Sequence, residues 1–184
     1  MKLTINTSFQ ENASSPYLLI LVDSEQLQKA ATAYEINDLN TLVEAAQFKA
    51  GLSESLPLIG KVAACSNSAL IGIDKAAEIQ PAKLAKIAQT IIKASQKKFK
   101  QISIDISALA AEHHYLFALA LTQASYAFDE YKSKKNEFIL EQIHLIASDS
   151  SLNPQQLSLI HAVQSGQSLA RDLGNRPGNI CFPE

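Results

Sequence analysis

The chain has 184 residues, a length typical of one domain, and its apolar fraction of 47% is enough to build a core without disulfide bonds. A net charge of −2 excludes a long-range attraction of the whole molecule to nucleic acid or to an anionic membrane. The two cysteines, Cys65 and Cys181, lie far apart in the sequence and form neither a disulfide framework nor a metal-binding motif, which fits a reducing cytoplasm.

The first half of the chain predicts strands and helices in alternation. Residues 2–7 alternate apolar and polar side chains, which predicts an edge or half-exposed strand, and residues 17–22 (YLLILV) predict a strand buried on both faces. This run is too short to span a bilayer, and residues 1–10 lack an apolar run of signal-peptide length. Two helices are expected, over about 24–34 and 41–50, the second stopped by Gly51. Three short strands are expected over 56–60, 61–65 and 69–73.

The second half continues this alternation. Pro81 suits the first turn of a helix that runs to about residue 98, and residues 101–107 predict a strand with Ile102, Ile104 and Ile106 on one face. A helix over about 109–124 and a strand over 142–147 follow. The sequence NPQQ at 153–156 predicts a capped start for a helix over 154–173. The order of elements predicts an α/β domain, with a mixed, mostly parallel sheet and helices on both faces.

No group of residues has the spacing of a known catalytic or metal site. The adjacent His113 and His114 lack the i, i+4 spacing of a helical zinc site, and structural or surface roles are favoured for all four histidines. Residues 58–61 (LIGK) lack the other residues of a phosphate-binding loop. Asp105, within its strand, fits either chemistry at a sheet edge or a simple polar position, and the second reading is favoured.

Two groups of lysines are candidates for contact with nucleic acid. Phosphate neutralisation by such side chains gives sequence-independent affinity. A solvated helix face explains the first group equally well, and the helix over 81–98 carries no aromatic residue to stack on bases. The first group lies in and after the helix that begins at Pro81, and the second follows residue 131; together they are Lys83, Lys86, Lys93, Lys97, Lys100, Lys132, Lys134 and Lys135.

Two stretches carry a resemblance to a known family. They are YAFDEYKSKKNE at 126–137 and ARDLGNRPGNICFPE at 170–184. The first resembles the pattern near the end of the N-terminal domain in the leucyl, or cytosol, aminopeptidase family. The second is similar to the family's Ala-Arg-Asp-Leu-x-Asn-x-Pro-x-Asn-x-Cys-x-Pro-Glu pattern. The matching positions in the second stretch are Ala170, Arg171, Asp172, Leu173, Asn175, Pro177, Asn179, Cys181, Pro183 and Glu184.

Two shorter stretches also resemble this family. FKAGLSE at 48–54 looks like its Phe-Lys-Gly stretch, and IGIDK at 71–75 looks like its Gly-x-Gly-Lys turn. Ala50 and Asp74 stand where the family usually has glycine, and these departures are expected to alter loop geometry. Arg176, Gly178 and Phe182 also depart from the commoner residues, and these departures are expected to alter the connection to the next part of the protein.

The resemblance implies an organisation for the chain. Residues 1–150 would form the N-terminal α/β domain, related to the macro domain, residues 151–174 a linking helix, and residues 175–184 the start of a connection to an absent catalytic domain. The inner positions of that helix, Leu157, Ile160, Leu169 and Leu173, are expected to be incompletely covered in this chain alone.

The resemblance also implies a function for the longer protein. In the family, the catalytic domain holds two divalent metal ions, manganese or zinc, and removes N-terminal residues such as leucine from peptides. No catalytic, metal-binding or cofactor-binding residue is assigned in these 184 residues, and the chain alone is expected to be inactive. The expected partners are its own C-terminal catalytic domain and the other subunits of a homo-hexamer in the cytoplasm, with no membrane. Two alternatives stay open: a DNA-binding module, and a macro-like module for a small ligand.

Overall fold

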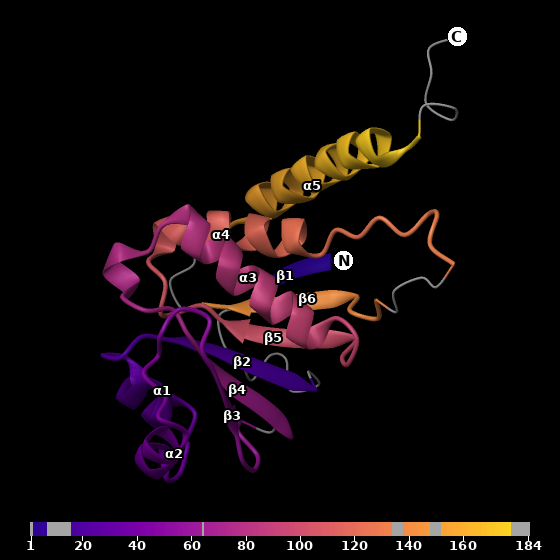
Figure 1. Cartoon of the computed structure of the whole chain (residues 1–184). Coiled ribbons are helices and arrows are strands. Elements are labelled where there is room, and N and C mark those ends of the chain that lie inside the picture. The colour runs from indigo at the N-terminus through magenta and orange to yellow at the C-terminus, as the bar shows by residue number, and fades with distance from the viewer. Residues whose placement is uncertain (1, 7–15, 64, 134–137, 148–151, 178–184) are drawn as a thin grey trace.

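The computed structural model describes residues 2–6, 16–63, 65–133, 138–147 and 152–177. At its centre lies a six-stranded sheet with the strand order β1-β6-β5-β2-β4-β3 (Figure 1). The strands are β1 (Lys2–Asn6), β2 (Tyr17–Val22), β3 (Ser55–Leu58), β4 (Asn67–Gly72), β5 (Gln101–Asp105) and β6 (Gln142–Ile146). The helices are α1 (Leu27–Ala33), α2 (Leu39–Ala46), α3 (Pro81–Ser95), α4 (Ala111–Ala124) and α5 (Pro154–Asn175), with a short 3-10 helix η2 (Ala76–Glu78) before α3.

The sheet is mixed and mostly parallel, as predicted. Every neighbouring pair of strands is parallel except β3 and β4, which are antiparallel. The strand β1 lies at one edge, in agreement with its alternating sequence. The strand β2 lies in the interior, and five of its six residues are buried, in agreement with its continuous apolar sequence.

Helices cover both faces of the sheet. Leu18, Ile20 and Val22 of β2 pack with residues of α1 and α2, whereas Leu19 and Leu21 point to the other face and pack with α3 and α4. The helix α5 lies outside α4 as a further layer (Figure 1). Its contact with the body is narrow, because Ile160 is the one buried residue of this helix.

Several predicted boundaries hold and have visible causes. Pro81 takes the first position of α3, where a missing N–H costs no hydrogen bond. Asn153 and Gln156 form the predicted capping box, each side chain bonding the other's backbone N–H at 2.9 Å. The helix α5 then continues through Gly174 to Asn175, two residues past its predicted end.

Two predictions about the elements are wrong. The described residues of the segment 61–65 form no strand: Val62 and Cys65 pair with each other in an isolated bridge. The helix α2 ends before Gln47, which adopts a left-handed conformation with φ 52°, and not at Gly51. A non-glycine residue in this conformation gives little signal in the sequence, whereas the more distant glycine gives a strong one.

Candidate functional site

The structure brings together the two stretches that carried the strongest family resemblance. Tyr126 follows α4, and its hydroxyl donates to Asp172 Oδ1 of α5 at 2.8 Å and accepts from Asn175 Nδ2 at 3.2 Å. The guanidinium of Arg171 lies 5.1 Å from the centre of the Tyr126 ring, a cation–π distance. We call these contacts the Tyr126 junction. They join residues nearly fifty positions apart.

Electrostatics and burial fix the state of Tyr126. Its pKa is raised, first by loss of solvation and then by its hydrogen bond to the Asp172 carboxylate. The phenol therefore stays protonated at neutral pH and keeps its proton available for Asp172. Farther out, Arg176 pairs with Glu130 at 3.3 Å and Lys132 pairs with Asp129, but these exposed ion pairs add little stability.

The two shorter family-like stretches also lie against each other. The backbone N–H of Asp74 donates to the Ala50 carbonyl at 2.9 Å, and the backbone groups of Gly72 bond Ser53 and Glu54 at 2.8 Å. Ala50 and Asp74 have φ values of 54° and 64°, the left-handed region that favours glycine. The expected change of loop geometry at these two departures is therefore not needed, since both residues adopt the conformation open to glycine. This pair of stretches has a structural role in holding the loop 48–54 on β4.

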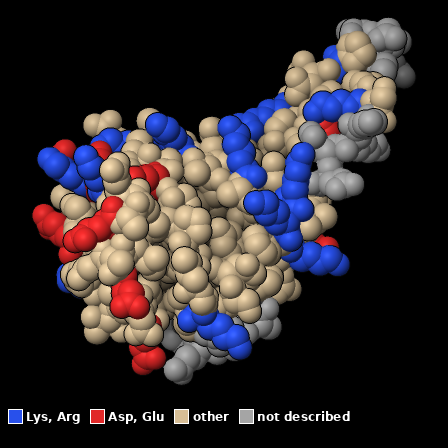
Figure 2. All heavy atoms as spheres, turned by 60° about the horizontal axis from the view of Figure 1, so that its bottom comes forward, with Lys and Arg blue, Asp and Glu red and all other residues tan. Residues whose placement is uncertain are grey.

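The candidate nucleic-acid lysines differ in their surroundings. Lys83 pairs with Asp74 at 2.9 Å, and this pairing holds the pKa of the Asp74 carboxyl below its usual value. Lys86 and Lys100 are exposed, and Lys134 and Lys135 lie outside the described residues. Lys93, Lys97 and Lys132 line one cavity of about 310 Å³. Figure 2 shows one face, on which basic side chains gather toward the end from which the C-terminal part projects.

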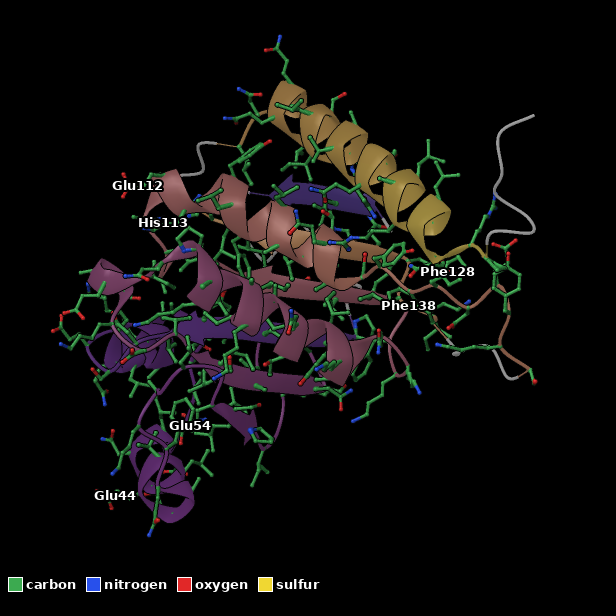
Figure 3. The ribbon with its side chains drawn as sticks, turned by 45° about the horizontal axis from the view of Figure 1, so that its top comes forward. Glu44, Glu54, Glu112, His113, Phe128 and Phe138 are labelled. Carbon is green, nitrogen blue, oxygen red and sulfur yellow. The ribbon has the colours of Figure 1, made fainter. Side chains whose placement is uncertain are left out.

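Sequence reasoning missed the other lining of this cavity. The helix α3 has no aromatic residue among its lysines, but the fold places Tyr126, Phe128 and Phe138 in the same cavity; Phe128 and Phe138 are labelled in Figure 3. The aromatic residues follow α4 or precede β6, whereas Lys93 lies in the last turn of α3 and Lys97 just after it. No sequence pattern links these segments, so only the folded chain reveals the combination. We call it the lysine–aromatic cavity, lined by Lys93, Gln96, Lys97, Ala124, Tyr126, Ala127, Phe128, Lys132 and Phe138.

Asp105 and the buried histidine have local partners. Asp105 Oδ2 accepts from the Tyr34 hydroxyl at 2.7 Å, and Oδ1 accepts from the Ser107 backbone at 2.8 Å. These bonds tie the end of α1 to the end of β5, which favours a structural role for Asp105. His114 is buried, and its Nε2 lies 3.0 Å from the Leu109 carbonyl. Burial lowers the pKa of His114, so the ring is neutral at physiological pH.

The described part of the chain holds neither a metal-binding cluster nor a membrane-spanning helix. Among these residues, no three histidine, cysteine, aspartate or glutamate side chains gather into a group that could hold a metal ion. No described helix is long and apolar enough to cross a membrane.

Comparison with known proteins identifies the family. Residues 18–135, more than half of the chain, match the cytosol aminopeptidase family, N-terminal domain. The chain belongs to this family. It is 62% identical over its whole length to a probable cytosol aminopeptidase of Acinetobacter baumannii and 58% identical to one of Acinetobacter baylyi. It is 30% identical to a probable cytosol aminopeptidase of Pseudomonas syringae pv. tomato, over 88% of this chain.

These relatives are longer proteins, since the chain spans 38% of the length of each of the three. Solved structures agree on the fold of this cytosol aminopeptidase domain. A mutant of tomato leucine aminopeptidase superposes with a TM-score of 0.76 at 16% identity, over all of this chain and 40% of that one. The bottromycin maturation enzyme BotP, in a complex with Mn, gives a TM-score of 0.66 at 15% identity over 92% of this chain and 34% of that one.

Proposed function

We propose that this chain is the non-catalytic N-terminal domain of a leucyl aminopeptidase and serves its assembly or regulation. The longer protein would release N-terminal residues, leucine among them, from peptides. Its two divalent metal ions, manganese or zinc, would be held outside this chain and would activate water for peptide hydrolysis. The family match and the greater length of the relatives support this proposal.

One feature of α5 carries the assembly role. Leu159, Leu169 and Leu173 are 53%, 60% and 44% exposed on this helix. With the exposed Ala162 and Gly166 they recur every three and four residues, the spacing of one continuous apolar seam on a helix. We call these five residues the outer stripe of α5. Of the inner positions expected to be incompletely covered, Leu169 and Leu173 are exposed and Leu157 is half-buried, whereas the expectation is wrong at Ile160, which is fully buried.

The partner that we propose for the outer stripe is the catalytic part of the same protein. In relatives that match this whole chain, most of the sequence lies outside the matched region. A part joined directly to α5 would meet the stripe at a high effective concentration. Burying one leucine side chain contributes about 1.5–3 kcal/mol, so three exposed leucines offer a substantial docking energy.

Two experiments test the proposed function. The 184-residue chain, assayed with leucine p-nitroanilide and manganese, should give no turnover above the blank, and turnover would contradict the proposal.

In the longer protein, the L169S/L173S double variant should lower the melting temperature or make the connection between the two parts more sensitive to protease. The matched control Gln155→Ser changes an exposed residue of α5 outside the stripe and should leave both measurements unchanged.

The oligomeric state and location of the longer protein are part of this proposal. We expect a homo-hexamer in the cytoplasm, in line with the family resemblance of the sequence. Native mass spectrometry of the longer protein measures the subunit number, and a monomer would contradict the expectation.

DNA contact is a second candidate function. Lys86, Lys93, Lys97 and Lys100 form no ion pair in the described part of the chain, so their amines are available to phosphate groups. Binding through them would weaken steeply as salt rises. Titration of duplex DNA at low and moderate salt tests this candidate, and binding that does not depend on salt would remove it. The macro-like ligand module stays a prediction that rests on fold alone.

A further inference from the structure

The lysine–aromatic cavity combines two kinds of lining. Ala124, Ala127, Phe128 and Phe138 are apolar or aromatic, and three lysines supply its charge. Figure 3 shows Phe128 and Phe138 near each other, below the last turn of α5. At about 310 Å³ the cavity is at the lower end of the range of small-molecule sites.

The charge of the cavity is unbalanced. Lys93 lies in the last turn of α3, Lys97 lies in the turn that follows this helix, and both line the cavity. Neither forms an ion pair in the described part of the chain, whereas Lys132 is paired with Asp129. Three lysines therefore line this space, and two of them lack a carboxylate partner among the described residues, so an incoming anion would find two unpaired amines.

Helix stability alone does not account for this arrangement. A lysine in the last turn of α3 interacts favourably with the negative end of the helix dipole, which would explain Lys93. It explains neither Lys132, which comes from the segment after α4, nor the aromatic side chains beside them. Phe128 and Phe138 are half-buried; Phe138 packs in part against the core, and each ring keeps some exposed surface.

The aromatic side is held in place by the Tyr126 junction. Tyr126 lines the cavity, and its hydroxyl is fixed by Asp172 and Asn175 of α5. Phe128 packs at a tilt against Tyr131, with ring centres 5.7 Å apart. A positioned aromatic surface favours the stacking of a flat ring on it.

We propose that the lysine–aromatic cavity binds a small organic anion that carries a flat aromatic ring, of the size and chemistry of a mononucleotide. The anionic group lies between Lys93, Lys97 and Lys132, and the ring lies on Phe128 or Phe138. This site is independent of the proposed aminopeptidase activity and of the outer stripe of α5.

Calorimetric titration of the 184-residue chain tests the proposal with three probes: adenosine 5′-monophosphate, adenosine and inorganic phosphate. The monophosphate should bind at least tenfold more tightly than either of its parts, and added salt should weaken it. Equal affinity for the monophosphate and for inorganic phosphate would overturn the proposal, as would the absence of binding by the monophosphate.

Variants locate the site. K93Q/K97Q should weaken binding of the monophosphate about tenfold or more, and Phe128→Leu should weaken the monophosphate but not inorganic phosphate. The control Lys86→Gln changes a lysine of α3 that does not line the cavity, and it should leave the affinity for the monophosphate unchanged. An equal loss of monophosphate binding in the Lys86→Gln variant would overturn the proposal. Tighter binding of duplex DNA than of the monophosphate at this site would also overturn it. The melting temperature of each variant verifies that it is folded.

Discussion

Gly72 shows how one residue can fix the position of a whole loop. A Cβ atom added to it would lie 2.2 Å from the Gly51 carbonyl oxygen and 2.4 Å from the Ala50 carbonyl carbon. Both neighbours are backbone atoms, which cannot rotate away as a side chain would. The loop 48–54 can cross β4 this closely only because position 72 carries no side chain.

We therefore predict that Gly72→Ala is strongly destabilising. The loss of unfolding free energy should reach about 3 kcal/mol or more, the upper end of overpacking effects, because the clash is with backbone. Urea denaturation of the 184-residue chain measures it. Gly174→Ala is the control, since nothing lies within 4 Å of an added Cβ there. A midpoint for Gly72→Ala equal to that of the unaltered chain would show that the loop does not lie on β4 as described.

The burial of the His114 imidazole predicts that the stability of the fold depends on pH. Its pKa lies below the ordinary value of 6.5, chiefly because burial disfavours the charged ring. As the pH falls through about 6.5, the His114 ring therefore binds a proton in the unfolded chain but stays neutral in the folded chain. The stability from His114 is fully present above pH 6.5 and is lost as pH falls toward the lower folded pKa.

Urea midpoints between pH 7.5 and 5.5 measure this effect. The midpoint should fall with decreasing pH, and His114→Gln should flatten the dependence, because glutamine does not titrate. Equal slopes in the two proteins would assign the pH dependence to other groups.

At the scale of elements, the Tyr126 junction determines how the far end of α5 is held. The first half of α5 is anchored by Ile160, whereas the last turns rest mainly on the Tyr126 hydroxyl and on the exposed Arg176–Glu130 pair. The family pattern in the sequence marked both partners but gave no reason for their presence. Their contact supplies a reason: residues of the two patterns bind each other and attach the end of α5 to the segment after α4.

We predict that Tyr126→Phe loosens the last turns of α5 and leaves its first turn unchanged. The variant keeps the ring beneath Arg171 but removes the hydroxyl group and with it the bonds to Asp172 and Asn175. Amide hydrogen exchange of residues 170–175 should become faster. Tyr131→Phe is the control, because Tyr131 is 49% exposed and contacts Phe128 through its ring. Unchanged exchange at 170–175 would contradict the role of Tyr126.

The elements show which structural features the sequence could predict. Strong periodicity and caps placed β2, β5, α3 and the start of α5 correctly, because the signal for each is local. The sequence of residues 61–65 resembles that of a strand because it is apolar. In the structure, Val62 and Cys65 are buried by tertiary contacts and lie outside the sheet. The lysine–aromatic cavity was out of reach for the same reason, because its parts meet only after α3, α4 and β6 have packed.

At the scale of the whole molecule, the narrow attachment of α5 leaves the outer stripe facing away from the body. Gly166 lies in the middle of this stripe, and nothing lies within 4 Å of a Cβ added there. A glycine inside a helix costs about 1 kcal/mol relative to alanine. Its presence at an open position is therefore unfavourable for this chain alone, which fits a surface shaped for something that approaches closely.

We therefore predict that a large side chain at position 166 is tolerated in this chain but destabilises the longer protein. In the 184-residue chain, Gly166→Ala should raise the melting temperature by about 2–4 °C, because helix propensity improves and no atom is displaced. Gly166→Leu should also be tolerated in this chain, since its side chain enters open space. In the longer protein, Gly166→Leu should lower the melting temperature, because the leucine would occupy space that the catalytic part fills. If Gly166→Leu stabilises both proteins equally, the outer stripe of α5 is not the surface on which the catalytic part docks.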